Sequence, residues 1–358
     1  MSSERPDPIL FVAYPMLPVS DSSCGGAEQM LWCLERELAR RGAATAVAAC
    51  EGSRVRGELL STGVAPTEPD RFEVREREHS VAVVRLCRQR SFALLHDKSG
   101  HFWRHAARVR CPVLATLHLP RSFYPPELFN SVAPNVFFNC VSESQADGFR
   151  DLPNFLGVVA NGIALERFTF TAAKQDYLLW IGRICPEKGT HLALDVARQL
   201  GMKLVVAGSV YPFSWHRQYF EREVRPRLEA AGSMAEFVES PPFARKVELL
   251  GQSRALLIPT LAPETSSLVA MEAMACGTPV VAFANGALPE VLVDGKTGFL
   301  VNDFDEMVNA IRRADSIDRR ECRAHVEARF NASRMADGYE RLYAMIQECV
   351  GKPVARVS

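Results

Sequence analysis

Two basic residues, Arg183 and Lys188, lie in a short segment that follows the apolar run Tyr177–Ile181 and ends at Gly189. The run predicts a buried strand, and open α/β sheets bind their ligands beyond the carboxyl ends of such strands. Gly189 allows the N-terminus of the following helix to approach a ligand closely. Two cations beside a helix N-terminus suit a diphosphate, whereas the loop taken alone fits solvated surface charges equally well.

A second group of polar residues surrounds a short apolar stretch, Ser267–Ala275, which predicts a buried helix. Glu264 precedes this helix, and Glu272 lies within it among apolar neighbours. A carboxylate in such surroundings needs a hydrogen-bonding partner, which can be a neighbouring loop or the hydroxyl groups of a ligand. In the ligand interpretation, Glu264 accepts hydrogen bonds from a sugar and Glu272 from a ribose. Ser266 or Ser267 is expected to cap the helix, and the amide groups at its start are expected to meet an anion.

These residues need a sheet that holds them at one edge, and the sequence alternates between strand and helix patterns along its length. Continuous apolar runs, typical of buried strands, are separated by amphipathic stretches such as Gly26–Arg41, and a connector at Phe168–Asp176 divides two such series. We therefore expect an α/β protein with two doubly wound, Rossmann-like domains. The predicted strands are Ile9–Tyr14, Ala44–Ala49, Ala93–His96, Val113–Leu117, Val136–Val141, Tyr177–Ile181, Lys203–Ala207, Ala255–Pro259 and Val280–Ala282.

The composition and charge of the chain exclude some classes of protein. Its 358 residues correspond to about two domains. The 42 Lys and Arg residues balance 42 Asp and Glu residues, which argues against a nucleic-acid binder. No apolar run approaches the roughly 20 residues that span a bilayer, and the charged start Met1–Pro8 lacks the features of a secretory signal. The 10 cysteines show no paired spacing of a zinc or redox site, so we expect a cytoplasmic protein.

Several catalytic motifs that this fold class suggests are missing. The turn after Ile9–Tyr14 lacks the glycine spacing of a dinucleotide-binding loop. Gly295-Lys296-Thr297 resembles the end of a P-loop, but Glu290 stands where that loop needs its first glycine. Neither Gly-x-Ser-x-Gly nor His-Glu-x-x-His occurs. Dehydrogenases, P-loop nucleotidases, and the corresponding hydrolases and metalloproteases are therefore disfavoured.

The spacing of Glu264 and Glu272, with the segment Ala273–Val281 after them, resembles the signature of retaining glycosyltransferases of family 4 (glycosyl transferases group 1), which have the GT-B fold. The resemblance covers nearly the whole chain. Its further motifs are Gly182-Arg183, Glu187-Lys188-Gly189, Asn161-Gly162-Ile163, Gly286–Glu290, Asp294-Gly295 with Gly298, Gly25–Glu28 and His118. The chain departs from the family pattern at Thr265-Ser266-Ser267, where Pro-Phe-Gly is common, and at Ser209-Val210, where a second glycine is common.

The resemblance implies two doubly wound domains that face each other across a cleft. Residues 1–168 correspond to the acceptor-side domain and residues 172–332 to the domain that binds the nucleotide-sugar donor. A helix at about residues 333–350 is expected to pack back on the first domain.

The resemblance also implies roles for individual residues. Arg183 and Lys188 hold the diphosphate, Glu264 holds the transferred sugar, and His118 reaches that sugar from the first domain. The implied catalytic residues are His118, Glu264, Arg183 and Lys188. The implied donor-binding residues are Gly25, Gly26, Arg183, Lys188, Ser266, Ser267, Leu268 and Glu272.

The implied reaction is the metal-independent transfer, with retention of configuration, of a hexosyl group from a UDP- or GDP-sugar to a glycan, lipid-linked or small-molecule acceptor, as in polysaccharide biosynthesis. Breaking the anomeric bond places negative charge on the leaving diphosphate, which fixed donors stabilise. Because Arg183, Lys188 and a helix N-terminus can supply this stabilisation, no metal and no other cofactor is expected. Two alternatives stay open: a nucleotide-sugar epimerase of the same fold, and a nucleotide-sugar-binding protein without turnover.

A basic segment, Arg104–Arg110, contains three arginines close to His101 and His105, with no acidic residue near it in the sequence. It is either a solvated face or a basic surface that meets anionic lipid or an anionic acceptor. In the second case the protein contacts the inner face of the membrane peripherally. No nucleic-acid partner is expected.

Overall fold

The computed structural model describes residues 7–23 and 25–351, so Cys24 and residues 1–6 of the charged start lie outside the described part. The chain divides into two compact units, which are considered separately. The first unit contains residues 1–162 and 332–358, and the second contains residues 163–331. The division after Gly162 lies six residues before the boundary at Phe168 that the sequence suggests.

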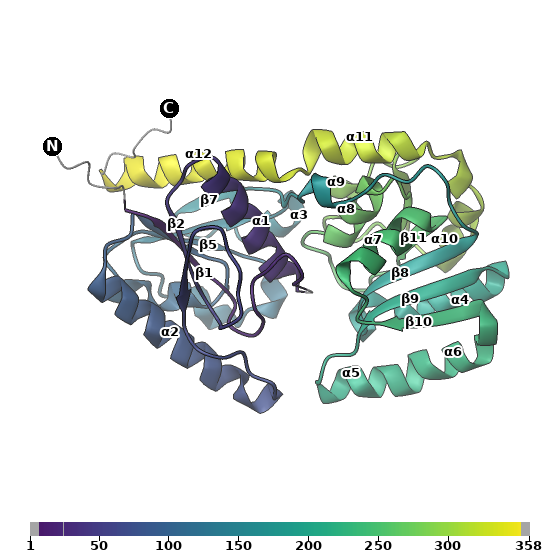
Figure 1. The fold of residues 1–358 in the computed structure, drawn as a ribbon, viewed down its shortest axis with the longest axis horizontal. Coiled ribbons are helices and arrows are strands. Elements are labelled where there is room, and N and C mark those ends of the chain that lie inside the picture. The colour runs from purple at the N-terminus through teal and green to yellow at the C-terminus, as the bar shows by residue number, and fades with distance from the viewer. Residues whose placement is uncertain (1–6, 24, 352–358) are drawn as a thin grey trace. The chain divides into compact units, whose positions relative to one another are not determined.

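The first unit is built on a seven-stranded parallel sheet in the order β3-β2-β1-β4-β5-β6-β7. Its strands β1, β2, β5 and β7 are labelled in Figure 1. Its strands are β1 (Ile9–Val12), β2 (Thr45–Ala49), β3 (Glu58–Ser61), β4 (Leu94–Asp97), β5 (Val113–Thr116), β6 (Val136–Cys140) and β7 (Phe155–Val158). Its α-helices are α1 (Gly26–Arg40), α2 (Phe72–Gln89), α3 (Glu143–Ala146) and α12 (Ala332–Val350). The C-terminal helix α12 packs against α1, which makes it part of this unit although the whole second unit precedes it in sequence.

The second unit contains a six-stranded parallel sheet in the order β10-β9-β8-β11-β12-β13. Its strands are β8 (Tyr177–Arg183), β9 (Lys203–Ser209), β10 (Ala235–Glu239), β11 (Ala255–Ile258), β12 (Val280–Phe283) and β13 (Gly298–Val301). Its α-helices are α4 (Thr190–Leu200), α5 (Ser214–Tyr219), α6 (Arg225–Ala231), α7 (Phe243–Gln252), α8 (Leu268–Ala275), α9 (Leu288–Val291), α10 (Phe304–Arg312) and α11 (Arg319–Arg329). Helix α8 packs against α7 and α11, and α4 packs against α6 and α10, which gives this unit the two groups of helices expected of a doubly wound domain.

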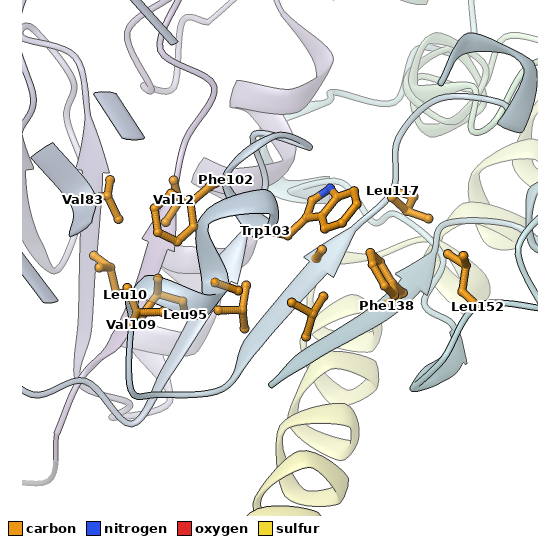
Figure 2. Packing of buried hydrophobic residues seen from close by; sticks show 14 of the residues in the cluster. Leu10, Val12, Val83, Leu95, Phe102, Trp103, Val109, Leu117, Phe138 and Leu152 are labelled. Atoms are coloured by element: carbon orange, nitrogen blue, oxygen red, sulfur yellow. The ribbon is translucent and has the colours of Figure 1, made fainter. Parts of the chain in front are cut away.

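One face of the first sheet is closed by a hydrophobic cluster (Figure 2). Trp103 lies in a short 3-10 helix, η2 (Phe102–Arg108), and its ring packs edge-on against Phe138 of β6 at 5.2 Å between ring centroids. The buried side chains of Val12 on β1 and Val83 on α2 belong to the same cluster. This packing stabilises the central strands, because burial of large apolar side chains is the main stabilising contribution of such a core.

The other face of the first sheet carries a buried polar network that fixes α12. The imidazole of His96 lies within hydrogen-bonding distance of Tyr343 Oη at 2.7 Å and of Thr116 Oγ1 at 2.8 Å. Lys98, also buried, donates to Tyr339 Oη at 3.2 Å. Because buried polar groups are costly without partners, these bonds specify one position for α12 on the sheet.

No helix among the described residues is both long and apolar enough to cross a membrane.

Candidate functional site

The residues predicted to hold the diphosphate and the sugar lie where the order of the second sheet reverses. Strands β8 and β11 are neighbours in space but are separated by β9 and β10 in sequence. The loops that follow β8 and β11 therefore leave the same edge of the sheet side by side, which is where doubly wound sheets bind ligands. Lys188 lies in the first of these loops and Glu264 in the second.

Backbone contacts between the two loops bring Lys188 to Glu264. The carbonyl oxygen of Glu187 accepts hydrogen bonds from the amide of Leu261 at 2.7 Å and from Thr260 Oγ1 at 3.1 Å. Gly189 has φ +64°, and a side chain there would overlap the carbonyl of Pro259. With the loops held in this way, Lys188 Nζ lies 2.5 Å from Glu264 Oε1, and the Glu264 side chain is 10% exposed.

The backbone of Glu264 is held from its other side by the loop after β12. Residues Glu264 and Gly286 form an isolated parallel bridge, and the amide of Ala287 donates to the Glu264 carbonyl at 2.7 Å. Gly286 has φ +62°, and a Cβ at this position would overlap the backbone of Glu264. Only glycine easily adopts this positive φ and also allows the close approach of the Glu264 backbone. The Gly286–Glu290 motif therefore supports Glu264.

Helix α8 begins at Leu268 and presents its first amide groups without a side-chain cap. Ser267 occupies the N-cap position, but its hydroxyl does not bond to the helix, so the expected serine cap is wrong. The ψ of Ser267 is only 90°, away from the fully extended backbone at which N-cap side chains usually reach the N2 or N3 amide. Ser266 Oγ is buried without a hydrogen-bond partner among the described residues. The uncapped amides and this hydroxyl can all donate to an anion.

Glu272 of α8 is buried and its partner is Lys246 of α7. Lys246 Nζ lies 2.7 Å from Glu272 Oε1, with the two side chains 14% and 5% exposed. The sequence suggested two possible partners for this carboxylate, a neighbouring loop or the hydroxyl groups of a ligand. The structure shows a third partner, a lysine from the adjacent helix. Lys246 was not predicted from the sequence, because no motif connects it to a glutamate 26 positions away.

Arg183 is the last residue of β8, which extends two residues beyond the predicted strand. Its side chain is exposed and forms no ion pair within the described ranges; its guanidinium carbon lies 5.7 Å from the centre of the Tyr211 ring. His216 of α5 is buried nearby, and burial and then the charge of Arg183 lower the pKa of this imidazole. The structure thus places Arg183 at the same sheet edge as Lys188 but in no direct contact with Glu264.

Gly25 and Gly26 belong to the first unit and begin α1. Gly25 is the N-cap residue, and a Cβ on it would overlap the carboxylate of Glu28. Glu28 is buried, and burial raises its pKa to about 7. The Glu28 carboxylate therefore leaves no space for a side chain at position 25, and a ligand that approached this loop would need the same space.

His118 also belongs to the first unit and lies two residues beyond the end of β5 at Thr116. Burial, with a smaller contribution from the positive charge of Lys98, lowers its pKa well below the usual value. The imidazole is therefore neutral at neutral pH and can serve as a hydrogen-bond donor or acceptor.

The described residues contain no group of three or more His, Cys, Asp or Glu side chains arranged to hold a metal ion. The sequence contains one pair of aspartates spaced by a single residue, Asp303 and Asp305, which could suggest a metal-binding motif. Asp303 is the N-cap of α10, and its carboxylate accepts from the amide of Glu306 at 2.9 Å. This pair is explained by helix capping.

The basic segment Arg104–Arg110 does have an acidic neighbour. His101 Nε2 lies 3.5 Å from Glu76 of α2, and Arg104 bonds to the carbonyl of His101 at 3.1 Å. The sequence alone shows no acidic residue near this segment, because Glu76 of α2 is distant in sequence but close in the fold. Contact with anionic lipid stays a prediction.

Residues 175–315, which lie within the second unit, match the family Glycosyl transferases group 1. A D-inositol 3-phosphate glycosyltransferase of Frankia alni is 33% identical over 201 residues, covering 50% of this chain and 48% of that protein. The chain spans about half the length of the curated relatives it matches.

Two solved structures share the fold across both units. Sucrose-phosphate synthase from Thermosynechococcus elongatus has a TM-score of 0.79 at 19% identity, covering 96% of this chain and all of that one. Anabaena HepE in complex with UDP-glucose has a TM-score of 0.76 at 17% identity, covering 95% of this chain and all of that one.

These similarities confirm the resemblance to the group 1 glycosyltransferases and the GT-B fold class. The family match falls within the second unit, which also holds Lys188, Glu264 and Glu272.

Proposed function

We propose that this protein is a glycosyltransferase whose second unit binds a nucleotide-sugar donor. The contact between Lys188 and Glu264 beside the uncapped start of α8 carries this proposal. It joins a cation suited to a phosphate and a carboxylate suited to sugar hydroxyls at one point of the sheet edge. The family match over the same unit supports the proposal.

In the proposed reaction, Lys188, Arg183 and the amides of Ser267 and Leu268 stabilise the negative charge that develops on the departing diphosphate. Such donors are worth about 3–4 kcal/mol each in a site from which water is excluded. Glu264 accepts hydrogen bonds from the transferred sugar and helps to balance the positive charge of its ring. Glu272 binds the ribose, and the loop Gly25-Gly26 and neutral His118 contribute from the first unit.

The finer points of the proposal rest on the resemblance of the motifs. We propose a hexosyl transfer with retention of configuration, from a UDP- or GDP-sugar, without a metal ion. The acceptor is a glycan, a lipid-linked molecule or a small molecule, held by the first unit. A related protein acts on an inositol phosphate according to its name, and HepE was solved with UDP-glucose, which supports a nucleotide-sugar donor of this kind.

Incubation with labelled UDP- and GDP-sugars and candidate acceptors tests the proposal. A transferase releases the nucleoside diphosphate in an acceptor-dependent way and moves the label to the acceptor. An epimerase of the same fold would isomerise the donor, and a binding protein would leave it unchanged. Either of these outcomes would overturn the proposal.

A further inference from the structure

We propose that Lys246 is a positioning residue that fixes the carboxylate of Glu272 for recognition of the donor's ribose. This inference rests on the proposed function, because it assumes that Glu272 binds the ribose of a nucleotide. It adds a residue outside every motif that the sequence resemblance includes. Lys246 lies on α7, and Glu272 lies on the adjacent helix α8.

The surroundings of Lys246 hold its ammonium group close to Glu272. Lys246 Nζ contacts the carboxylate oxygen Oε1 of Glu272 at 2.7 Å. The ammonium also lies 5.3 Å from the centre of the Phe243 ring and 6.0 Å from that of Phe168. Two aromatic rings and a carboxylate therefore limit the positions that this flexible side chain can adopt.

A second cation near this pair, Arg323, interacts with groups other than Glu272. The guanidinium of Arg323 donates to the carbonyls of Phe168 and Ala275 and pairs with Glu327. Lys246 is therefore the ion-pair partner of Glu272 within the described ranges. A buried carboxylate that lost this partner would be left as an uncompensated charge or would take up a proton.

A protonated or displaced Glu272 would be a poor acceptor for ribose hydroxyl groups. Hydrogen bonds to charged groups contribute about 1.5–3 kcal/mol, which corresponds to roughly tenfold to a hundredfold in affinity. Loss of Lys246 should therefore remove much of the preference for a ribose over a deoxyribose. A lysine that merely joined α7 to α8 would change stability without changing this preference.

The test compares UDP and GDP with their 2′-deoxy and 3′-deoxy analogues by titration calorimetry. The variants are Lys246→Met, Lys246→Arg and the double variant Lys246→Met with Glu272→Gln, in which no uncompensated charge is left in the pair. Lys203→Met is the matched control, because Lys203 pairs with Glu236 at 2.8 Å in the same unit with both side chains about 40% exposed. Circular dichroism checks that each variant is folded.

We expect the wild-type protein and Lys203→Met to bind the ribonucleotide at least about tenfold more tightly than a deoxy analogue. Lys246→Met and the double variant should lose this difference, and Lys246→Arg should recover part of it. Full ribose preference in Lys246→Met would overturn the positioning role alone, whereas full preference in the double variant, which lacks the carboxylate itself, would overturn the role of Glu272 and the positioning role with it. A wild-type protein that binds nucleotides without ribose preference would overturn the role of Glu272 and this inference together, and one that binds no nucleotide would overturn the proposed function as well.

Discussion

Lys188 and Glu264 form an ion pair with 2.5 Å between Nζ and Oε1, although 76 residues separate them in sequence. Each has a separate role in the proposed reaction, one toward the diphosphate and the other toward the sugar. A diphosphate that binds Lys188 therefore shares this cation with Glu264, or replaces the carboxylate as its partner. This competition gives the two residues opposite effects on nucleotide affinity.

The first prediction concerns this pair. Glu264→Gln should leave UDP or GDP affinity unchanged or increase it by a few fold, because the competing charge is removed, while turnover falls by roughly a hundredfold or more. Lys188→Met should weaken both nucleotide binding and turnover. Calorimetry and steady-state kinetics on the two variants measure these effects, with Lys203→Met as a surface control. A Glu264→Gln enzyme with wild-type turnover would contradict the assigned role.

Gly286 supplies the second prediction, because it holds the backbone of Glu264. Gly286→Ala combines a left-handed backbone with an overlap that only a backbone shift relieves, so it should lower stability by about 2 kcal/mol or more and reduce transfer. Gly295→Ala is the matched control: Gly295 has φ +70°, but its Cβ would have no neighbour within 4 Å. Urea unfolding and activity assays should show only the smaller conformational cost, about 1 kcal/mol, for the control. Equal effects of the two changes would rule out the support that we assign to Gly286.

The proposed metal independence supplies the third prediction. Exhaustive treatment with EDTA should leave transfer unchanged, because Lys188, Arg183 and the start of α8 provide the positive charge. Asp305→Asn, which removes one member of the Asp303-x-Asp305 pair but leaves the helix cap intact, should likewise have full activity. Loss of activity with EDTA that is restored by added magnesium or manganese ions would contradict the mechanism.

The central strands of both sheets were predictable because their apolar runs are continuous. The strands that sequence analysis missed include β3, β7 and β10, and all three lie at sheet edges with partly exposed side chains. An edge strand packs against one neighbour only, so its sequence carries a weaker hydrophobic pattern. The order and type of the buried elements could therefore be inferred from the sequence, whereas the number of strands in each sheet could not.

The candidate site was predictable to the extent that its residues are set by local sequence. The position of Lys188 at the end of a strand and that of Glu264 before a helix follow from the pattern of elements. The pairing of Glu272 with Lys246 does not, because it depends on how α7 packs against α8. The absent serine cap at Ser267 has a similar origin, since tertiary contacts set the backbone angles there.

The fourth prediction concerns Glu28, which lies in the first turn of α1 close to Gly25. Its pKa is raised from 4.5 to about 7 by burial, so between these values the folded protein holds a proton that the unfolded chain releases. Stability therefore decreases as pH rises through this window, and the full penalty is present above pH 7. A shift of this size corresponds to roughly 3 kcal/mol at most.

Glu28→Gln should remove this dependence. Below about pH 5 the variant and the wild-type protein should have similar stability, and at pH 8 the variant should be more stable by about 1–3 kcal/mol. The difference between the two proteins is the quantity to measure, by urea unfolding from pH 5 to 8. His79 and His101, whose pKa values are lowered to about 4, destabilise both proteins equally as pH falls below 6.5, and so cancel. A stability difference that is constant across this range would show that Glu28 titrates normally and that burial does not control its charge.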